Sequence, residues 1–581
     1  MDPQHKTETR DGMSIEWDAA IKTDDGVVLR ADVFRPLGEG RYPVILSYGP
    51  YAKGLAFQEG YKSAWTRLTR DHPEVLAGSS NLYQNWELVD PEKWVPDGYI
   101  CMRVDSRGAG RSPGTLDVWS AREARDLYDC IEWAGQQPWS NGKVGLNGIS
   151  YYAMNQWQVA GLQPPHLAAM CAWEGASDYY RELSRHGGIL CDFLSNWWER
   201  QVISVQHGVG ARGAKSPVTG EPVAGPPTLP AEALVENRAR SGDEIEKRRL
   251  IDGYYQARMP AFEAMTVPLL SAANWGGQGL HSRGNFEGFE RAASPRKWLE
   301  VHGSSHFHHF YSNYGDDLQR RFFGHFLKGC DTGWTRQPPV QLNVRHPGET
   351  FVVRAEQEWP LARTLWTRFH LDPAGLDLAL AAPAAATTLD YATTGDGVTF
   401  LTPALSEPLE VTGPVAVKLF LASDTVDADV FIALRLYDQA GREVVFVGAN
   451  DPRMPISLGW LRASHRKLDA AQSKPWRPVH THVEPQPLTP DEPVELDIEV
   501  WPTSIVAPAG YRLGLTVRGR DYEYDGTDAA LPHAPYPMKG VGPFTHTNPS
   551  DRPPAIFGGT NTLHFAPGRM PYVLLPVIPA A

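Results

Sequence analysis

The stretch Lys143-Val-Gly-Leu-Asn-Gly-Ile-Ser-Tyr-Tyr-Ala153 decides the fold of this chain. Its apolar first half is typical of a short buried strand, and a helix-compatible segment over residues 154–162 follows at once. Ser150 therefore falls on a sharp turn between a strand and a helix, which would hold its hydroxyl above the edge of a sheet. Gly148 has no side chain to collide with such a turn. A second glycine usually follows the serine by two residues, and Tyr152 stands there instead, so the motif is a half match.

Apolar runs with the length of buried strands recur on both sides of this stretch. Segments with helical periodicity lie between them, and a predicted hairpin over residues 14–36 precedes them. The alternation of strand and helix predicts a parallel sheet with right-handed crossovers, and so an α/β fold. The predicted strands are residues 43–47, 99–105, 167–173, 267–273 and 297–301, and the predicted helices are residues 118–137, 281–292 and 315–328.

Two regions depart from this alternation. Residues 175–263 contain aromatic helical material with Phe193, Trp197 and Trp198, then a Gly/Pro-rich loop and a charged helix over 231–250. This insertion follows the C-terminal end of a strand, where ligands of such sheets bind, so we interpret it as a helical cap. Residues 336–581 carry short alternating β segments between turns, which is typical of a β-sandwich, here a jelly roll. The predicted domains are 1–174 with 264–335, the cap 175–263, and the β-sandwich 336–581.

Length and composition limit the function classes. A chain of 581 residues is too long for one core. The net charge of −13 argues against a nucleic-acid partner, because phosphate binding needs a positive surface. No apolar run approaches a membrane span, and the N-terminus lacks the apolar core of a signal peptide, so we expect a cytoplasmic protein. A homo-oligomer is compatible with the sequence. Five cysteines in apolar surroundings indicate reduced, buried thiols: Cys101, Cys130, Cys171, Cys191 and Cys330.

A serine nucleophile needs a base, because its hydroxyl is a poor nucleophile at neutral pH. In α/β hydrolases the histidine lies on the loop after the last core strand. Here that loop reads His302-Gly-Ser-Ser-His-Phe-His-His309, and His306 is the predicted base. The four histidines could also be read as a metal cluster, but the loop has no nearby carboxylate or cysteine to complete it. The sequence therefore predicts neither a metal nor a cofactor.

Several motifs together resemble the cocaine esterase/X-prolyl dipeptidyl peptidase family of serine hydrolases, over essentially the whole chain. The resemblance implies an α/β-hydrolase domain, a helical cap and a C-terminal jelly roll. It also implies an oxyanion hole made by the hydroxyl of Tyr51, in the turn Gly49-Pro-Tyr51, and by the backbone N–H of Tyr151. The motifs are those around Ser150, Gln137-Pro-Trp-Ser-Asn-Gly-Lys-Val-Gly145, Asp105-Ser-Arg-Gly-Ala-Gly-Arg-Ser112, Gly459-Trp-Leu-Arg-Ala-Ser-His-Arg466 and Leu574-Leu-Pro-Val-Ile-Pro579.

The acid of the triad departs from the family pattern. Family members carry an aspartate in a Gly-Trp-Tyr-Asp-like turn after the cap, but here the turn is Asn274-Trp-Gly-Gly-Gln-Gly-Leu-His281, without a carboxylate. Glu174, at the end of the strand after the serine helix, is the predicted substitute, and Asp178 is its competitor. A third alternative is that neither reaches His306, and that Asn274 or Gln278 orients the imidazole instead.

The leading functional prediction is a serine hydrolase that cleaves a small carboxylic ester or amide through an acyl-enzyme, with the cap aromatics shaping an acyl pocket. An α-amino acid ester hydrolase or β-lactam acylase is the first alternative, because Glu174, Asp178 and Glu182 could bind a substrate ammonium group. An X-prolyl dipeptidyl peptidase is less favoured, because the extra N-terminal domain of some members is absent. From another class, a non-catalytic protein could bind glycans on the jelly roll and keep a degenerate elbow.

Overall fold

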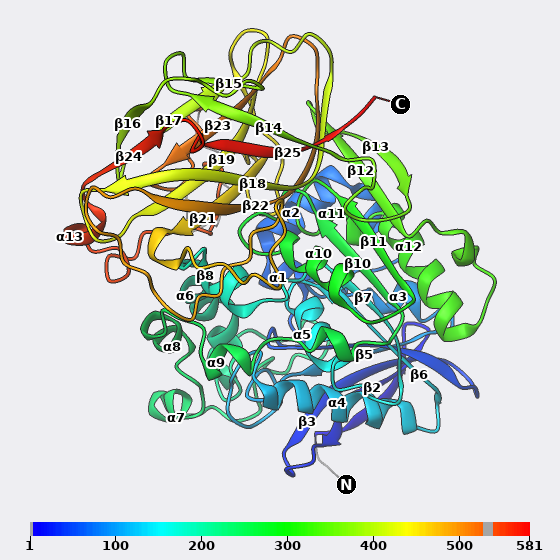
Figure 1. Cartoon of the computed structure of the whole chain (residues 1–581). Helices are drawn as coiled ribbons and strands as arrows, with labels where there is room; N and C mark the ends of the chain where they lie inside the picture. Colours follow the sequence, from blue (N-terminus) through cyan, green and yellow to red (C-terminus); the bar gives the residue numbers. More distant parts are fainter. Residues whose placement is uncertain (1–3, 527–537, 581) are drawn as a thin grey trace.

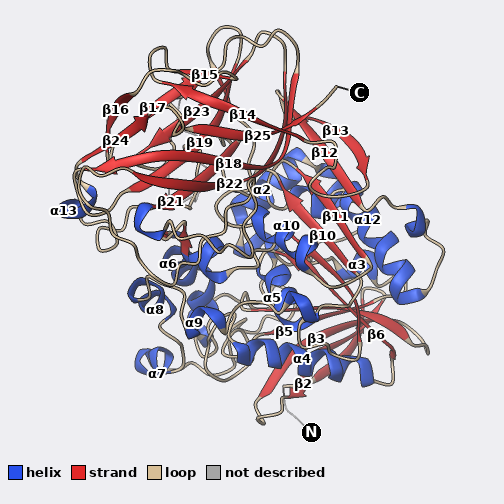
Figure 2. Ribbon diagram, viewed as in Figure 1, coloured by secondary structure: helices blue, strands red, loops and turns tan. Residues whose placement is uncertain are grey.

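Two large β-sheets organise the chain, which the computed structural model describes over residues 4–526 and 538–580. The first has eleven strands and the second twelve. Figure 2 shows helices packed around the first sheet, whereas the second sheet forms an almost purely β body at the other end of the molecule. The chain therefore combines a large mixed α/β domain with a C-terminal β domain.

The first sheet has the strand order β1-β2-β3-β5-β4-β6-β7-β10-β11-β12-β13. Its centre, from β5 to β12, is parallel, and antiparallel strands flank it at both ends. The parallel sheet predicted from the sequence is thus confirmed, as is the hairpin β2–β3. The strands are β1 (Lys6–Arg10), β2 (Met13–Lys22), β3 (Val28–Pro36), β4 (Tyr42–Gly49), β5 (Ile100–Asp105), β6 (Ser140–Ile149), β7 (Leu167–Trp173), β10 (Leu269–Asn274), β11 (Lys297–His302), β12 (Val340–His346) and β13 (Thr350–Glu356).

Helices cover both faces of this sheet. On one face, α4 (Ala121–Gln136) and α5 (Tyr151–Ala160) bury Leu127 and Trp157 in one apolar cluster, and α10 (Ser282–Arg291) approaches Trp157 closely at Gly288. On the other face, α3 (Pro91–Trp94), α11 (His308–Tyr311) and α12 (Asn313–Phe323) share a second apolar cluster. The two layers bury the parallel strands on both sides, which explains their continuous apolar runs. Within the described ranges, no helix has both the length and the apolar character that a membrane crossing requires.

The segment after β7 is irregular and mostly helical. Figure 1 shows α6, α8 and α9 beside α5 and below β21 of the C-terminal domain. The predicted helix over 231–250 is instead two short helices, because the main chain between them pairs with Leu116. Leu116 N donates to Asn237 O at 2.9 Å, and Ala239 N donates to Leu116 O at 2.8 Å. The elements are β8 (Arg185–His186), β9 (Ile189–Leu190), α6 (Phe193–Trp197), α7 (Ala231–Glu236), α8 (Ser241–Lys247) and α9 (Gly253–Gln256).

The second sheet runs in the order β16-β24-β18-β22-β21-β19-β23-β17-β15-β14-β25, and β18 also pairs with β25, so the sheet returns onto itself. Its inner face holds an apolar cluster that includes Leu419, Ile432 and Leu515. The strands are β14 (Leu365–Asp372), β15 (Asp377–Ala379), β16 (Thr387–Ala392), β17 (Val398–Leu401), β18 (Leu409–Ser423), β19 (Asp429–Tyr437), β20 (Glu443–Val444), β21 (Ser457–Arg462), β22 (Val494–Ala507), β23 (Arg512–Arg518), β24 (Thr560–Phe565) and β25 (Tyr572–Ile578).

Two details differ from the sequence-based expectation. The strands β12 and β13 lie beyond residue 335 yet extend the first sheet, because β12 pairs in parallel with β11. An alternating β pattern does not reveal which sheet a strand joins. Cys330 is exposed, whereas the other four cysteines are buried as predicted. It follows Gly329, whose left-handed backbone, with a φ of 70°, ends the preceding helical turn and leads the chain into a surface loop.

Candidate active site

Ser150 stands on the sharp turn between β6 and α5. Its backbone has a φ of 58° and a ψ of −115°, a conformation that non-glycine residues adopt rarely. The Ser150 N–H donates to the main-chain oxygen of Trp173 at 3.0 Å, which ties the turn to the end of β7. The predicted strand–turn–helix is confirmed. It places the hydroxyl at the carboxyl ends of the parallel strands, where ligands of such sheets bind.

Tyr152 fills the place of the missing second glycine because two other glycines make room for it. Gly148 has a φ of 154°, and a Cβ atom there would lie 2.5 Å from the Cβ of Tyr152. A Cβ on Gly49, at the end of β4, would lie 2.6 Å from Cε1 of the same tyrosine. The ring of Tyr152 therefore packs over the neighbouring strand, and the half match is compatible with an intact turn.

Tyr51 lies against the same turn. Its ring makes edge contacts with the rings of Tyr151 and Tyr152, at centroid distances of 5.9 and 5.8 Å. The indole Nε1–H of Trp197, on α6, donates to the Tyr51 hydroxyl at 3.0 Å, which leaves the proton of that hydroxyl available for another acceptor. Burial, reinforced by the nearby carboxylate of Glu87, raises the pKa of Tyr51 well above its ordinary value, so the hydroxyl stays protonated.

Tyr151 is the first residue of α5. Its backbone N–H belongs to the first turn of the helix, where N–H groups have no partner within the helix. Its side chain is directed toward α4, where the hydroxyl donates to the buried carboxylate of Glu123. The side chain is thereby held away from the turn, while the N–H beside Ser150 keeps the orientation of a helix N-terminus.

Glu174 reaches His306. The carboxylate oxygen Oε2 lies 2.9 Å from Nδ1 of His306, and Oε1 lies 2.9 Å from Nε2 of His302. Asn274 adds a weaker contact, from its amide to Oε1 of Glu174 at 3.3 Å. Glu174 directly follows β7 with a φ of 46°, so the backbone turns sharply at the residue that carries this carboxylate. The structure thus brings together the histidine and the acid that the sequence had singled out.

The charges of this group reinforce one another. Burial by itself would raise the pKa of Glu174, but His306 and His302 outweigh it and lower this pKa to about 2. Burial by itself would lower the pKa of His306, but Glu174 and Glu87 outweigh it and raise this pKa to about 10. Glu174 is therefore an anion at neutral pH, and His306 in this arrangement is an imidazolium that donates from both nitrogens.

Glu87 is the site residue that the sequence analysis missed. Its Oε1 lies 2.9 Å from Nε2 of His306, on the side of the imidazole opposite Glu174. It is 2% exposed with a φ of 63°, and its main-chain oxygen accepts from Ile149 N at 3.1 Å, next to the serine turn. Burial raises its pKa to about 7 despite the contact with His306. The only signal in the sequence is one acidic residue among apolar neighbours in the long irregular stretch before β5.

Asp178 and Glu182 are held elsewhere. Asp178 caps the following helical turn through the N–H groups of Tyr180 and Arg181, and pairs with the Arg181 guanidinium at 2.7 Å. Glu182 pairs with Arg283 at 2.7 Å. Both carboxylates are thus engaged by arginines, whereas Glu174 is bound by His302 and His306.

Comparison with known proteins decides the family. The X-Pro dipeptidyl-peptidase (S15 family) profile matches residues 25–308, and the X-Pro dipeptidyl-peptidase C-terminal non-catalytic domain matches residues 332–573. The chain belongs to the cocaine esterase/X-prolyl dipeptidyl-peptidase family of serine hydrolases. It is 24% identical to the cocaine esterase of Rhodococcus sp., over 88% of this chain and 92% of that protein. A crystal structure of a CocE/NonD family hydrolase from Staphylococcus aureus is 29% identical, with a TM-score of 0.84 over 98% of this chain and 94% of the other.

In this serine hydrolase the turn after β10 packs against the group around His306 and contributes no carboxylate to it. Asn274 donates to the main-chain oxygen of Ser304 at 2.9 Å, which holds the loop that carries His306. Gln278 does not orient the imidazole, because its amide binds main-chain oxygens of Trp275 and Pro502. His281, at the end of the turn, stacks on His306 with ring centroids 4.6 Å apart.

A cavity of about 470 Å3 opens beside the site of this hydrolase. Its wall includes Trp86, next to Glu87, and Trp197, which binds Tyr51. Phe193 also lines it, as the sequence suggested. Trp198 is buried in the aromatic cluster behind the cavity instead. The remaining aromatic walls are Tyr61 and Phe307.

Proposed function

We propose that this serine hydrolase cleaves a carboxylic ester or amide of a small molecule through an acyl-enzyme. Ser150 is the nucleophile, His306 the general base and then the acid, and Glu174 the carboxylate that orients the imidazole. The observation that carries this assignment is the 2.9 Å contact between Glu174 Oε2 and His306 Nδ1. It is supported by the main-chain bond from Ser150 to Trp173, which brings the serine turn to the residue preceding Glu174.

In the first step, the Ser150 oxygen attacks the substrate carbonyl while its proton moves to Nε2 of His306. That nitrogen must carry a lone pair to accept the proton, but its N–H now faces Glu87. That proton must therefore be lost before acylation, and Glu87 is the neighbouring group that can pass it on to solvent. His306 then delivers the serine proton to the leaving alcohol or amine. In deacylation, water attacks the acyl-enzyme carbonyl, gives its proton to His306, and His306 returns a proton to the Ser150 oxygen as the acid product leaves.

The oxyanion of the tetrahedral intermediate is stabilised by two donors, the Tyr51 hydroxyl and the Tyr151 N–H. Trp197 supports this role, because its N–H occupies a lone pair of the Tyr51 oxygen and turns the hydroxyl proton outward. The aromatic cavity lined by Phe193 and Trp197 holds the acyl group. No metal or cofactor takes part in these steps.

We also propose the finer fold assignment: an α/β-hydrolase domain, a helical cap over residues 175–263 and a C-terminal jelly roll. It is supported by the positions of the proposed triad, after β6, β7 and β11 of the parallel sheet. The helices α6 to α9 beside these strand ends support the cap, and the closure of β18 onto β25 supports the jelly roll.

The test is labelling with a fluorophosphonate probe, combined with hydrolysis of p-nitrophenyl esters of graded acyl length. Wild-type enzyme is expected to be labelled on Ser150 and to hydrolyse at least one ester, whereas Ser150→Ala is neither labelled nor active. The variant should remain folded, because one half-buried hydroxyl contributes little to stability. An unlabelled wild type that still binds carbohydrate would favour the non-catalytic alternative.

A further inference from the structure

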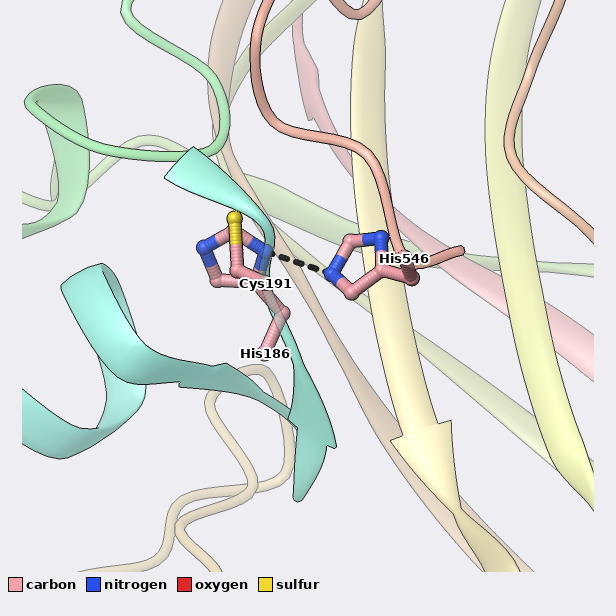
Figure 3. Close-up of side chains that lie close together, drawn as sticks. All are labelled: His186, Cys191 and His546. Carbon is pink, nitrogen blue, oxygen red and sulfur yellow. Dashed lines mark hydrogen bonds between the residues drawn. The ribbon is translucent and has the colours of Figure 1, made fainter. Parts of the chain in front are cut away.

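A second group of reactive side chains lies away from Ser150, where the cap meets the C-terminal domain. His186 comes from β8, Cys191 follows β9, and His546 lies on the segment before α13 (Pro554–Phe557). One ligand atom of each lies within 4.8 Å of the others, and none of the three residues is more than 1% exposed. Figure 3 shows the two imidazole rings edge to edge, with the cysteine sulfur beside the ring of His186.

The contacts of the two histidines bear on which ring nitrogens carry hydrogens. Nδ1 of His546 lies 2.7 Å from the Asp521 carboxylate, which also accepts the backbone N–H of His546, so this nitrogen carries a hydrogen. Nε2 of His186 lies 3.2 Å from the main-chain oxygen of Glu182, which can only accept, and this longer contact favours a hydrogen on Nε2.

Neutral imidazole has a single N–H. With hydrogens on these outer nitrogens, Nδ1 of His186 and Nε2 of His546 present lone pairs to each other across 2.9 Å, and a metal ion between them would take both. With the other tautomer of His186, the same contact is a hydrogen bond between two neutral rings.

Cys191 favours the metal ion, because a hydrogen bond between two imidazoles does not need a sulfur atom beside it. Imidazole nitrogen and cysteine sulfur are the preferred ligands of zinc. The Asp521–His546 bond is also the contact that orients and strengthens zinc-bound histidines in other proteins. Two nitrogens on one tetrahedral zinc are separated by roughly 3.3 Å, so the nitrogens must part by a few tenths of an ångström and the rings must tilt until both lone pairs point at the metal.

We propose that His186, Cys191 and His546 bind one zinc ion, which joins the cap to the C-terminal β domain. Binding requires the Cys191 thiol to lose its proton, and the thiolate and both imidazoles then each donate a lone pair to the metal. Three protein ligands leave one coordination position for water or another donor.

The site would stabilise the wall of the active site indirectly. Asp192 follows Cys191 and binds the hydroxyl and main chain of Thr545 at 2.8 Å each, so the two segments are already joined beside the ligands. Helix α6 begins at the next residue and carries Trp197, which donates to Tyr51. A metal at this junction would fix the start of the helix that holds the proposed oxyanion donor.

The experiment uses the full chain without a histidine tag, produced in medium supplemented with zinc and, separately, with copper. Metal content is measured by elemental analysis, and thermal unfolding is followed with and without a chelator. We expect about one zinc per chain and a lower Tm in chelator, because a ligand that binds only the folded state stabilises it. Replacement by Co2+ should add a thiolate-to-cobalt absorption band.

Cys191→Ala should lose the zinc and the chelator effect, whereas the matched control Cys130→Ala, another buried cysteine, should keep both. Wild-type protein without stoichiometric metal and with a chelator-insensitive Tm would overturn the proposal, because a hydrogen bond alone would then join the rings. Copper in place of zinc, or equal zinc in Cys191→Ala and wild type, would also overturn the proposal. If Cys191→Ala does not fold, the wild-type metal content and the cobalt spectrum still decide. None of these readouts depends on hydrolysis.

Discussion

Nε2 of His306 lies 2.9 Å from Oε1 of Glu87, a carboxylate 219 residues away in the chain. The imidazole therefore stands between two carboxylates, with Glu174 on Nδ1 and Glu87 on Nε2. Glu174 is bound by two histidines, His302 and His306, whereas Glu87 contacts only His306 of these two. In the proposed mechanism, His306 exchanges its contact with Glu87 for one with Ser150.

The first prediction concerns the pH dependence of the wild type. We expect kcat/KM to rise with pH between about 7 and 10, because the pKa of Glu87 is raised to about 7 and that of His306 to about 10. His306 must lose its Nε2 proton before it can accept one from Ser150. The measurement is a pH series with an aryl ester, with Ser150→Ala as the blank for spontaneous hydrolysis. A profile that is flat from pH 6 upward would contradict this prediction.

Glu87→Gln should move the acidic limb of that profile to lower pH. The amide keeps the shape of the side chain but removes the negative charge that stabilises the imidazolium, so the pKa of His306 falls. A shift of about one unit or more is typical of a charge at this distance. Glu39→Gln, on the exposed surface, is the control and should leave the limb unchanged. An identical limb in Glu87→Gln and wild type would exclude Glu87 from the proton exchange.

Glu174→Gln should lower kcat by about 10⁴-fold, the loss known for the corresponding Asp→Asn change in a serine protease, because the amide favours the wrong imidazole tautomer. Asp178→Asn should keep near-normal kcat and chiefly lower stability, since Asp178 caps a helical turn and pairs with Arg181. Both are measured as kcat together with thermal unfolding. The reverse pattern would make Asp178 the acid, and full activity in both variants would mean that the site works as a dyad.

Tyr51→Phe should lower kcat by about a hundredfold or more with little change in KM, because an oxyanion donor acts on the transition state. Tyr61→Phe is the matched control: its ring also packs against Tyr51, but its hydroxyl contacts Gln201 at 3.3 Å. The control should keep its kcat. A change of Tyr51→Phe confined to KM would show that Tyr51 only binds substrate.

Local sequence was sufficient for the parts of this protein that depend on neighbours in the chain. Strand, turn and helix around Ser150 follow from apolar runs and one glycine, and the positions of Glu174 and His306 follow from where strands end. Parallel strands meet at one edge of a sheet, so residues at their carboxyl ends are brought together by the topology alone. The choice between Glu174 and Asp178 stayed open, because their contacts, Glu174 with His306 and Asp178 with Arg181, depend on how the chain packs.

Only the tertiary structure revealed Glu87 and the group of His186, Cys191 and His546. Glu87 lies in an irregular stretch without periodicity, and its direction is set by its backbone and by the bond from Ile149. His186 and His546 are 360 residues apart and meet only because the segment after β7 packs on the C-terminal domain. A periodic pattern records which side of an element is buried, but not what that side is buried against. Contacts between distant, irregular segments are therefore decided by packing, after the local structure has formed.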